Sequence, residues 1–264
     1  MAPDRHSGKV ALITGGGSGI GRATAHRFAR EGAAAVHVVD HFSDRAERVA
    51  GELRDLGVRS VAIAAELAEL EGCHRAVDVV LEAEGRIDLA VSNAAAWTEE
   101  PFLDMKDESW LKVIGVNLTG YFRVAQRAAQ AMARAGDGGV ILFTASVSSL
   151  GASPEFAHYS AAKAGVANLA QTMAIELAPH RIRVNCVSPG PADTQQSVDL
   201  VGEELMDKWR AEGFPVVPMN RLASADDIAA AFSFLASDDA AYVTGVNLVV
   251  DGGLTAHAYS VPES

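Results

Sequence analysis

The chain has 264 residues, of which 49% are hydrophobic and 21% charged, and this length and composition suit one globular domain. Its formal net charge of -12 argues against nucleic acid and against an anionic membrane surface as partners, because both require a basic protein face. The sequence contains no run of about 18 uncharged apolar residues, so it predicts no membrane-spanning helix.

The beginning of the chain and the cysteines favour a cytoplasmic protein. Residues 1–7 are polar and lead into an apolar run that is short enough to be a strand and too short for a signal peptide. Cys73 and Cys186 lie far apart, outside any CxxC motif, which predicts two reduced and buried thiols. The eight histidines are scattered along the chain, and we therefore expect no metal site.

Short apolar runs alternate with longer amphipathic segments along the chain. Strands are predicted at 9–14, 35–40, 60–65, 87–92, 139–145, 183–187 and 246–250. Helices are predicted at 20–31, 44–56, 68–83, 107–134, 157–178 and 225–236. The strand segments lack strict alternation of polar and apolar residues, as is typical of strands covered on both faces. The pattern predicts the α/β class, with a doubly wound parallel sheet of about seven strands.

One segment interrupts this alternation, and the rest indicates a single domain over residues 1–264. Residues 191–220 contain several prolines and two aromatic residues, Trp209 and Phe214, in a mostly polar context. A long insertion of this kind is often a lid over a binding site. A surface excursion with a short helix fits the pattern equally well. Residues 254–264 are predicted to form a short C-terminal tail.

A glycine-rich turn joins the first predicted strand to the first predicted helix. Glycines in such a turn let the backbone approach a pyrophosphate, which then lies at the helix N-terminus. Asp40 ends the second predicted strand, where a carboxylate can accept the ribose hydroxyls of adenosine and would repel a 2′-phosphate. Ser18 and His41 occupy the positions at which NADP-binding proteins place a basic residue. The turn residues predicted to bind the cofactor are Gly15, Gly17, Ser18, Gly19 and Ile20.

Tyr159 and Lys163 are four residues apart in a predicted helix, so their side chains lie on one face. A phenol with an ordinary pKa near 10 is a poor base at neutral pH, and a neighbouring ammonium group favours the phenolate. The pair therefore predicts an acid–base group of the type that hydride transfer from an alcohol requires.

The glycine turn, Asp40 and the Tyr159–Lys163 pair, in this order, resemble the short-chain dehydrogenase/reductase family, whose one-domain members have about 250 residues. The resemblance extends from Gly8 to Leu254 and implies a Rossmann fold and an NAD-dependent oxidoreductase. It implies that Tyr159 is the general acid or base and that Lys163 lowers the pKa of Tyr159 and binds the nicotinamide ribose. Ser146, thirteen residues before Tyr159, would polarise the substrate oxygen. Asn117 would kink its helix and hold a proton-relaying water.

The same resemblance assigns further cofactor contacts. Glu66 and Leu67 stand where the family has the Asp-Val pair that contacts adenine. The segment 92–95 reads Ser-Asn-Ala-Ala where the family has Asn-Asn-Ala-Gly, so Ser92 and Ala95 depart from the pattern. Residues of the segment 188–194 would hold the nicotinamide carboxamide. The added cofactor-binding residues are Asn93, Ala94, Pro189, Gly190 and Thr194, together with Tyr159 and Lys163.

The substrate is the least defined part of the prediction. Ser146, Tyr159, Trp97, Ser148, Pro191 and Trp209 are predicted to bind it, within a lining that also includes Ala96, Val147, Phe156, His158, Val198, Leu200 and Met206. This lining predicts a small, neutral and moderately apolar secondary alcohol or ketone. Two alternatives remain open: an NADPH-dependent ketoreductase or enoyl reductase, and a sensor that binds a dinucleotide without turnover. Asp40 weighs against NADPH, and the spacing from Ser146 to Tyr159 weighs against the enoyl type.

Assembly is predicted from the helices at 107–134 and 157–178. In relatives these two helices form a contact between subunits. Small residues on their faces predict the same contact in this chain and hence a homotetramer with closed two-fold symmetry. These residues are Ala125, Ala128, Ala129, Ala164, Ala167 and Ala174.

Overall fold

A seven-stranded parallel sheet forms the centre of the computed structural model, which describes residues 4–256. The strand order is β3-β2-β1-β4-β5-β6-β7, so the winding reverses between β1 and β4 and opens a crevice at the carboxyl ends of the strands. The strands are β1 (Val10–Thr14), β2 (Ala35–Asp40), β3 (Ala62–Ala64), β4 (Leu89–Ser92), β5 (Gly139–Thr144), β6 (Ile182–Pro189) and β7 (Asn247–Val250). Part of the predicted C-terminal tail, 257–264, lies outside the described residues.

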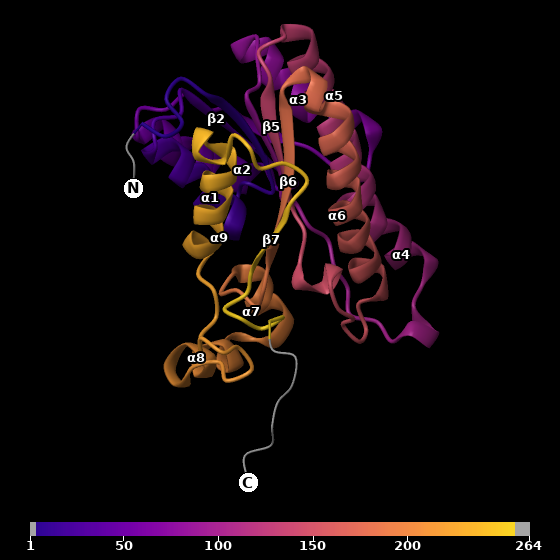
Figure 1. Ribbon diagram of the computed structural model, residues 1–264. Helices are drawn as coiled ribbons and strands as arrows, with labels where there is room; N and C mark the ends of the chain where they lie inside the picture. Colours follow the sequence, from indigo (N-terminus) through magenta and orange to yellow (C-terminus); the bar gives the residue numbers. More distant parts are fainter. Residues whose placement is uncertain (1–3, 257–264) are drawn as a thin grey trace.

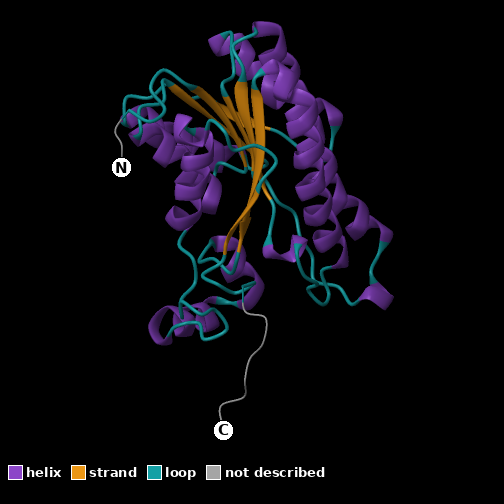
Figure 2. Ribbon diagram, viewed as in Figure 1, coloured by secondary structure: helices purple, strands orange, loops and turns teal. Residues whose placement is uncertain are grey.

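Helices cover both faces of the sheet (Figures 1 and 2). One layer contains α1 (Gly19–Arg30), α2 (Ser43–Asp55) and α9 (Ala225–Ala236). The opposite layer contains α3 (Leu70–Glu84), α5 (Tyr121–Ala135) and α6 (Ala157–Leu177), with α4 (Asp107–Ile114) packed against α6. The predicted fold class, a doubly wound parallel sheet of seven strands, is therefore confirmed.

Strand β1 shows why the sequence lacks polar alternation. Val10 and Leu12 point into the core beneath α3 and α5, whereas Ala11 and Ile13 point into the core beneath α1 and α9. All four side chains are buried, because successive residues of a strand face opposite sides of the sheet and helices cover both sides.

The predicted helix at 107–134 is interrupted. Between α4 and α5 the chain forms a π-helical segment, Gly115–Gly120, which contains Asn117. The Asn117 amide nitrogen donates hydrogen bonds to the carbonyls of Val113, 2.9 Å away, and Ala96, 2.5 Å away. Gly120 lets this segment approach the chain after β3, since a Cβ there would lie 2.6 Å from the Leu67 carbonyl oxygen. The side chain of Asn117 thus competes with backbone N–H groups for the carbonyl of Val113, at the place where the α-helix widens into a π-helix.

The segment 191–220 carries two short helices, α7 (Gln195–Val201) and α8 (Glu203–Glu212), below the sheet (Figure 1). Arg210 ties α8 to the start of the segment through an ion pair with Asp193 at 2.8 Å. Trp209 packs edge-on against Phe214, with ring centroids 4.7 Å apart. The segment is therefore held by its own side chains. Closure of this segment as a lid stays a prediction.

The small residues expected at a subunit contact are mostly part of the protomer's own core. Ala125, Ala128, Ala129 and Ala174 are each less than 9% exposed and pack beneath the sheet. That interpretation of these four residues was wrong, because the helices turn their small side chains toward the closely approaching strands. The outward surface of the same helices instead carries Trp110, Phe122 and Ile175, which are 39%, 42% and 78% exposed.

A buried polar cluster joins the start of the chain to α1 and α9. The Nε2 of His6 lies 3.4 Å from the Glu31 carboxylate and 3.2 Å from the Ser233 hydroxyl, which itself hydrogen-bonds Glu31. Arg27 pairs with Glu31 at 3.1 Å. Burial lowers the pKa of His6 to about 4, partly offset by Glu31 and reinforced by Arg5, Arg27 and Lys9.

This cluster predicts acid sensitivity. The unfolded chain protonates His6 near pH 6.5 but the native protein only near 4, so the free energy of unfolding should fall as pH drops between these values. The loss expected from His6 is on the order of 3 kcal/mol. Chemical denaturation of His6→Gln should show a smaller loss, with the exposed His180→Gln as control. Identical pH dependence in His6→Gln and the wild type would contradict the role of His6.

Candidate active site

A cleft of about 1330 Å³ opens at the carboxyl ends of the central strands. A volume of this size exceeds that of ordinary small-molecule pockets and suits a dinucleotide together with a substrate. Most of the predicted site residues line it: Gly15, Ser18, Gly19, Ile20, Asp40, Glu66, Leu67, Asn93, Ala94, Trp97, Ser146, Ser148, Tyr159, Lys163, Pro189, Gly190, Pro191 and Thr194. Among the residues predicted to act in catalysis or to bind the cofactor or substrate directly, Gly17, Asn117 and Trp209 do not line the cleft.

The glycine turn between β1 and α1 is shaped for close backbone approach. Gly15 has φ of +62°, and a Cβ at this position would lie 2.6 Å from the Ala94 Cα. A Cβ on Gly21 would lie 2.1 Å from the Gly15 carbonyl oxygen, so α1 can begin directly against the turn only with glycine there. The N-terminus of α1 then faces the cleft, where its unpaired N–H groups can bind a pyrophosphate.

Asp40 is held in place at one end of the cleft. Its two carboxylate oxygens accept hydrogen bonds from the N–H groups of Gly17, at 3.0 Å, and Phe42, at 3.1 Å. Gly17 thus orients Asp40 from behind instead of lining the cleft. Arg45 lies beside Asp40 with its guanidinium 4.4 Å from the centre of the Phe42 ring. Sequence reasoning missed Phe42 and Arg45, because no motif marks them.

Asn93 connects the glycine turn to the strand that carries Ser146. Its amide nitrogen donates to the Gly15 carbonyl at 3.2 Å, and its amide oxygen accepts from the Thr144 hydroxyl at 2.9 Å. The Thr14 hydroxyl accepts from the backbone N–H groups of Asn93 and Ala94. These bonds fix the carboxyl ends of β1, β4 and β5 relative to one another. The hydrogen-bonding task of this segment is carried by Asn93, although Ser92 and Ala95 depart from the family pattern.

Ser146 and Tyr159 both line the cleft. Ser146 follows β5 and its hydroxyl oxygen accepts from the Ser148 N–H at 3.1 Å. Burial raises the pKa of Tyr159 to about 12, and a hydrogen bond with Ser146 partly offsets this increase. The sequence predicted that Lys163 lowers the pKa of Tyr159. In this structure burial dominates the pKa of Tyr159, and the Lys163 ammonium group hydrogen-bonds Tyr121 and Thr144.

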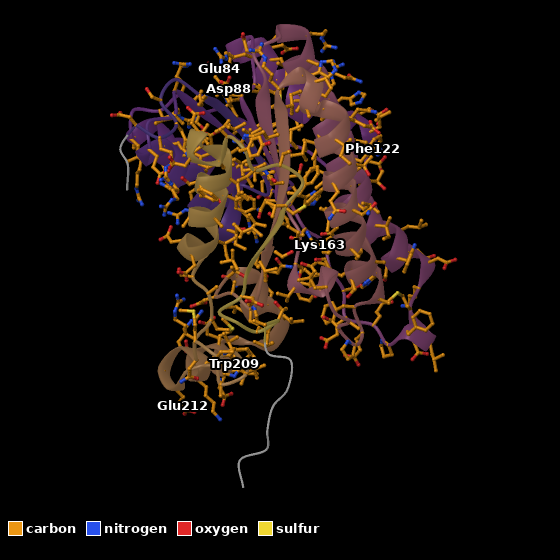
Figure 3. All side chains as sticks on the ribbon, in the orientation of Figure 1. Glu84, Asp88, Phe122, Lys163, Trp209 and Glu212 are labelled. Atoms are coloured by element: carbon orange, nitrogen blue, oxygen red, sulfur yellow. The ribbon has the colours of Figure 1, made fainter. Side chains whose placement is uncertain are left out.

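Lys163 extends from α6 into the base of the cleft and is completely buried (Figure 3). Its ammonium group donates to the Thr144 carbonyl at 2.7 Å and to the Tyr121 hydroxyl at 3.2 Å, and it lies 5.4 Å from the centre of the Tyr159 ring. Burial lowers the pKa of Lys163 to about 7. The ammonium group therefore lies beside the phenol ring of Tyr159. Because its pKa is lowered by burial, its protonation depends on the groups that hydrogen-bond it.

Asn117 lies behind the cleft in the π-helical segment. Its side chain is fully buried, and its amide oxygen has no hydrogen-bond partner among the described residues. A buried acceptor without a partner is costly and is commonly satisfied by an ordered water. This environment fits the predicted water-holding role of Asn117.

The expected substrate lining needs correction. Trp209 lies on α8, well below Lys163 (Figure 3), because it packs on Phe214. Val147, His158, Val198 and Met206 do not line the cleft either. His158 is buried, with its Nε2 2.7 Å from the Thr98 hydroxyl.

Polar side chains that the sequence did not indicate take their place. The hydroxyl oxygens of Ser148 and Ser153 lie 3.1 Å apart, and the backbone N–H of Ser148 donates to the Ser146 hydroxyl. Gln195, Gln196, Ser197 and Asp199 enter the cleft from α7. Two side chains of opposite charge, Lys112 and Glu69, also line the cleft. The only sequence signal for the α7 residues was their position directly after Thr194.

Residues 4–256 contain no group of three or more His, Cys, Asp or Glu side chains that could hold a metal ion. Within the same range, none of the helices combines the length and the apolar character that crossing a bilayer requires. Cys73 and Cys186 are both buried thiols, as predicted.

Comparison with known proteins gives consistent matches over nearly the whole chain. A family model described as Enoyl-(Acyl carrier protein) reductase matches residues 15–255. The chain is 39% identical over 252 residues to the L-rhamnose 1-dehydrogenase (NAD(P)(+)) of Azotobacter vinelandii, covering 93% of this chain and 96% of that protein. A short-chain type dehydrogenase/reductase from Mycobacterium marinum superposes with a TM-score of 0.87 at 36% identity, covering 96% of this chain and 98% of that one. A candidate NAD(P)-dependent gluconate 5-dehydrogenase from Beutenbergia cavernae, with NADP bound at low occupancy, superposes with a TM-score of 0.88 at 34% identity. This match covers 96% of this chain and 99% of that one.

Proposed function

Because this chain belongs to the short-chain dehydrogenase/reductase family, we propose that it uses NAD to oxidise a secondary alcohol, or NADH to reduce the matching ketone. One observation carries the proposal: the glycine turn, Asp40, Ser146, Tyr159 and Lys163 all open into one cleft. The chain thus combines a dinucleotide-binding turn with an acid–base group in a single cavity. The family model's description names an enoyl reductase, but Ser146 beside Tyr159 suits an alcohol or carbonyl oxygen.

The chemistry follows from the groups around Tyr159. When bound, NAD supplies a nicotinamide ring that accepts a hydride from the carbinol carbon. Ser146 donates a hydrogen bond to the substrate oxygen and Tyr159 accepts the hydroxyl proton of the alcohol, so that the carbon–hydrogen and oxygen–hydrogen bonds break as the carbonyl forms. Lys163 supplies positive charge beside Tyr159 and favours its phenolate. In the reductive direction, Tyr159 returns the proton to the oxygen.

Residues from separate elements would hold the two ends of the cofactor. Asp40 would accept both hydroxyls of the adenosine ribose, since its carboxylate already faces the cleft on two backbone hydrogen bonds. Lys163 would donate to the nicotinamide ribose. The remaining proposed contacts are Gly15, Ser18, Gly19 and Ile20 for the pyrophosphate, Glu66, Leu67, Asn93 and Ala94 for the adenosine half, and Pro189, Gly190 and Thr194 for the carboxamide. Gly17 would act on the cofactor through Asp40, which its backbone N–H holds.

We expect NAD to be preferred over NADP by at least tenfold in kcat/KM, or about 1.4 kcal/mol. Asp40 would meet the 2′-phosphate with like charge, whereas Arg45 at the same rim could pair with it and limits the expected preference. Asp40→Ala should erode the preference, chiefly by weakening NAD binding. Initial rates with both cofactors test this, with Asp44→Ala, an exposed carboxylate on α2, as control. Equal efficiencies with NAD and NADP in the wild type would contradict it.

The substrate we propose is a small neutral alcohol that carries additional hydroxyl groups. The amides of Gln195 and Gln196 and the hydroxyls of Ser148 and Ser153 offer several donors and acceptors, and Trp97 offers an apolar face. A hydroxylated ring can hydrogen-bond these polar groups when it covers them, whereas a hydrocarbon ring would shield them from water and leave them unpaired.

A panel of matched alcohols tests the proposal. NADH formation should be more efficient with cyclic polyols and sugars than with cyclohexanol, and Gln196→Leu should remove that advantage while leaving cyclohexanol unchanged. A preference for cyclohexanol would overturn the substrate class alone. Tight NADH binding without turnover of any alcohol or ketone would instead favour the dinucleotide sensor, and activity restricted to NADPH and ketones would favour the biosynthetic reductase.

We propose that the chain forms a homotetramer in the cytoplasm. The exposed apolar side chains of Trp110, Phe122 and Ile175 on α4, α5 and α6 support a contact with a second subunit. The buried thiols of Cys73 and Cys186 support a reducing compartment. Light scattering at micromolar concentration should give the mass of four chains, and Phe122→Glu should lower it. A monomeric wild type would refute the assembly.

A further inference from the structure

Tyr121 is the first residue of α5 and lies directly after the π-helical segment. Its side chain is 1% exposed and its ring packs against Phe143, with centroids 5.8 Å apart. Its hydroxyl oxygen lies 3.2 Å from the Nζ of Lys163. Tyr121 does not line the cleft, and its hydroxyl group reaches the site by its hydrogen bond with Lys163.

The bonds of Lys163 show what this contact does. An ammonium group has three N–H donors and no acceptor. The Thr144 carbonyl accepts one of them at 2.7 Å and the Tyr121 hydroxyl accepts a second. The third N–H is left for the cleft, which Lys163 lines. Two fixed acceptors thus leave one donor of the ammonium group free for the cleft, where a cofactor would bind.

Two phenols flank this single cation, and they differ in their access to the cleft. Tyr159 lines the cleft together with Ser146, whereas Tyr121 is buried against Phe143 of β5 and Lys163 of α6. Burial raises the pKa of Tyr121 well above 10. Tyr121 therefore stays neutral and serves as a hydrogen-bond acceptor, not as a second base.

We infer that Tyr121 is a positioning residue, which holds the Lys163 ammonium group against the Thr144 carbonyl so that its free N–H points into the cleft. The inference rests on the proposed role of Lys163 in binding the cofactor and supporting Tyr159. A neutral acceptor also favours the charged form of a buried lysine. Loss of the Tyr121 hydroxyl should therefore leave the Lys163 ammonium group less firmly oriented and its charged form less favoured.

The variant Tyr121→Phe removes only the hydroxyl and keeps the ring against Phe143. We expect the NADH dissociation constant, measured by fluorescence titration, to rise about tenfold, the effect of one hydrogen bond to a charged group. The kcat/KM for alcohol oxidation should fall by a similar factor. Its apparent pKa should move upward, because a less favoured ammonium group supports the Tyr159 phenolate less well. A purely structural role would not move this pKa.

Two comparisons separate positioning from packing. In a Lys163→Ala background, Tyr121→Phe should cause no further loss of NADH affinity, because the hydroxyl has lost its partner. Phe143→Leu, which disturbs the ring contact but keeps the hydroxyl, should leave the pH profile unchanged. Tyr242→Phe, at a fully exposed tyrosine, is the matched control.

Several results would overturn the inference. These are an unchanged NADH affinity and pH profile in Tyr121→Phe, an equal loss in both Lys163 backgrounds, or a shift reproduced by Phe143→Leu. The binding titrations do not need turnover, so they decide the role of Tyr121 even if the wild type oxidised no alcohol and the proposed function failed.

Discussion

Tyr159→Phe is expected to lower kcat by about 10²–10⁴-fold, the contribution typical of a general acid–base group. Only the phenol oxygen is removed, and the ring keeps its edge contact with Phe156, whose centroid lies 6.4 Å away. NADH affinity should stay close to that of the wild type, because the glycine turn, Asp40 and Lys163 are untouched. A fall in turnover with retained binding separates a chemical role from a binding role.

Initial rates and a fluorescence titration with NADH, made on the same preparation, give both quantities. Tyr242→Phe makes the same chemical change at an exposed site and should behave as wild type. If Tyr159→Phe kept substantial activity, another residue would be the acid–base group, and the assignment from the family pattern would fail at its centre.

Lys163→Ala should damage both cofactor binding and chemistry. The ammonium group is proposed to hold the nicotinamide ribose and to supply charge beside Tyr159, so NADH affinity should fall about tenfold or more and kcat/KM still further. The variant also leaves the Thr144 carbonyl without its 2.7 Å donor, so thermal unfolding must be recorded beside the kinetics. An unchanged NADH affinity in a folded Lys163→Ala variant would contradict the ribose contact.

The pH dependence of the same variant tests the charge of Lys163. Alcohol oxidation needs a deprotonated Tyr159, so kcat/KM should rise with pH. In the free protein, burial raises the pKa of Tyr159 to about 12, which would leave too little phenolate at neutral pH. We expect the apparent pKa with NAD bound to lie well below 10, because positive charge next to the phenol favours the phenolate, and to move upward in Lys163→Ala. Coincident profiles for the two proteins would contradict this role.

The sequence predicted the sheet well because the strands are covered on both faces. The apolar runs locate all seven strands, and 35–40 and 225–236 match the bounds of β2 and α9. The break between α4 and α5 could not be predicted in this way. The break depends on a hydrogen bond from the Asn117 side chain to the carbonyl of Ala96, which lies 21 residues earlier in the chain, after β4.

The candidate site was predictable where its residues belong to one short segment. The glycine turn and the Tyr159–Lys163 pair are local patterns, and both line the cleft. Tyr121 was missed because it approaches Lys163 from another helix, 42 residues away in the sequence. Trp209 was assigned wrongly because an aromatic residue in a loop can pack on a neighbour such as Phe214 as readily as on a substrate.

Transfer of isotope from the substrate to the cofactor reports directly on the proposed hydride transfer. The wild-type chain would be incubated with NAD and a secondary alcohol, selected from the panel and carrying deuterium on the carbinol carbon. We expect the NADH formed to carry that deuterium, because the hydride passes directly between the two carbons held in the cleft beside Tyr159. NADH without deuterium, or no NADH from any labelled alcohol despite NAD binding, would contradict it.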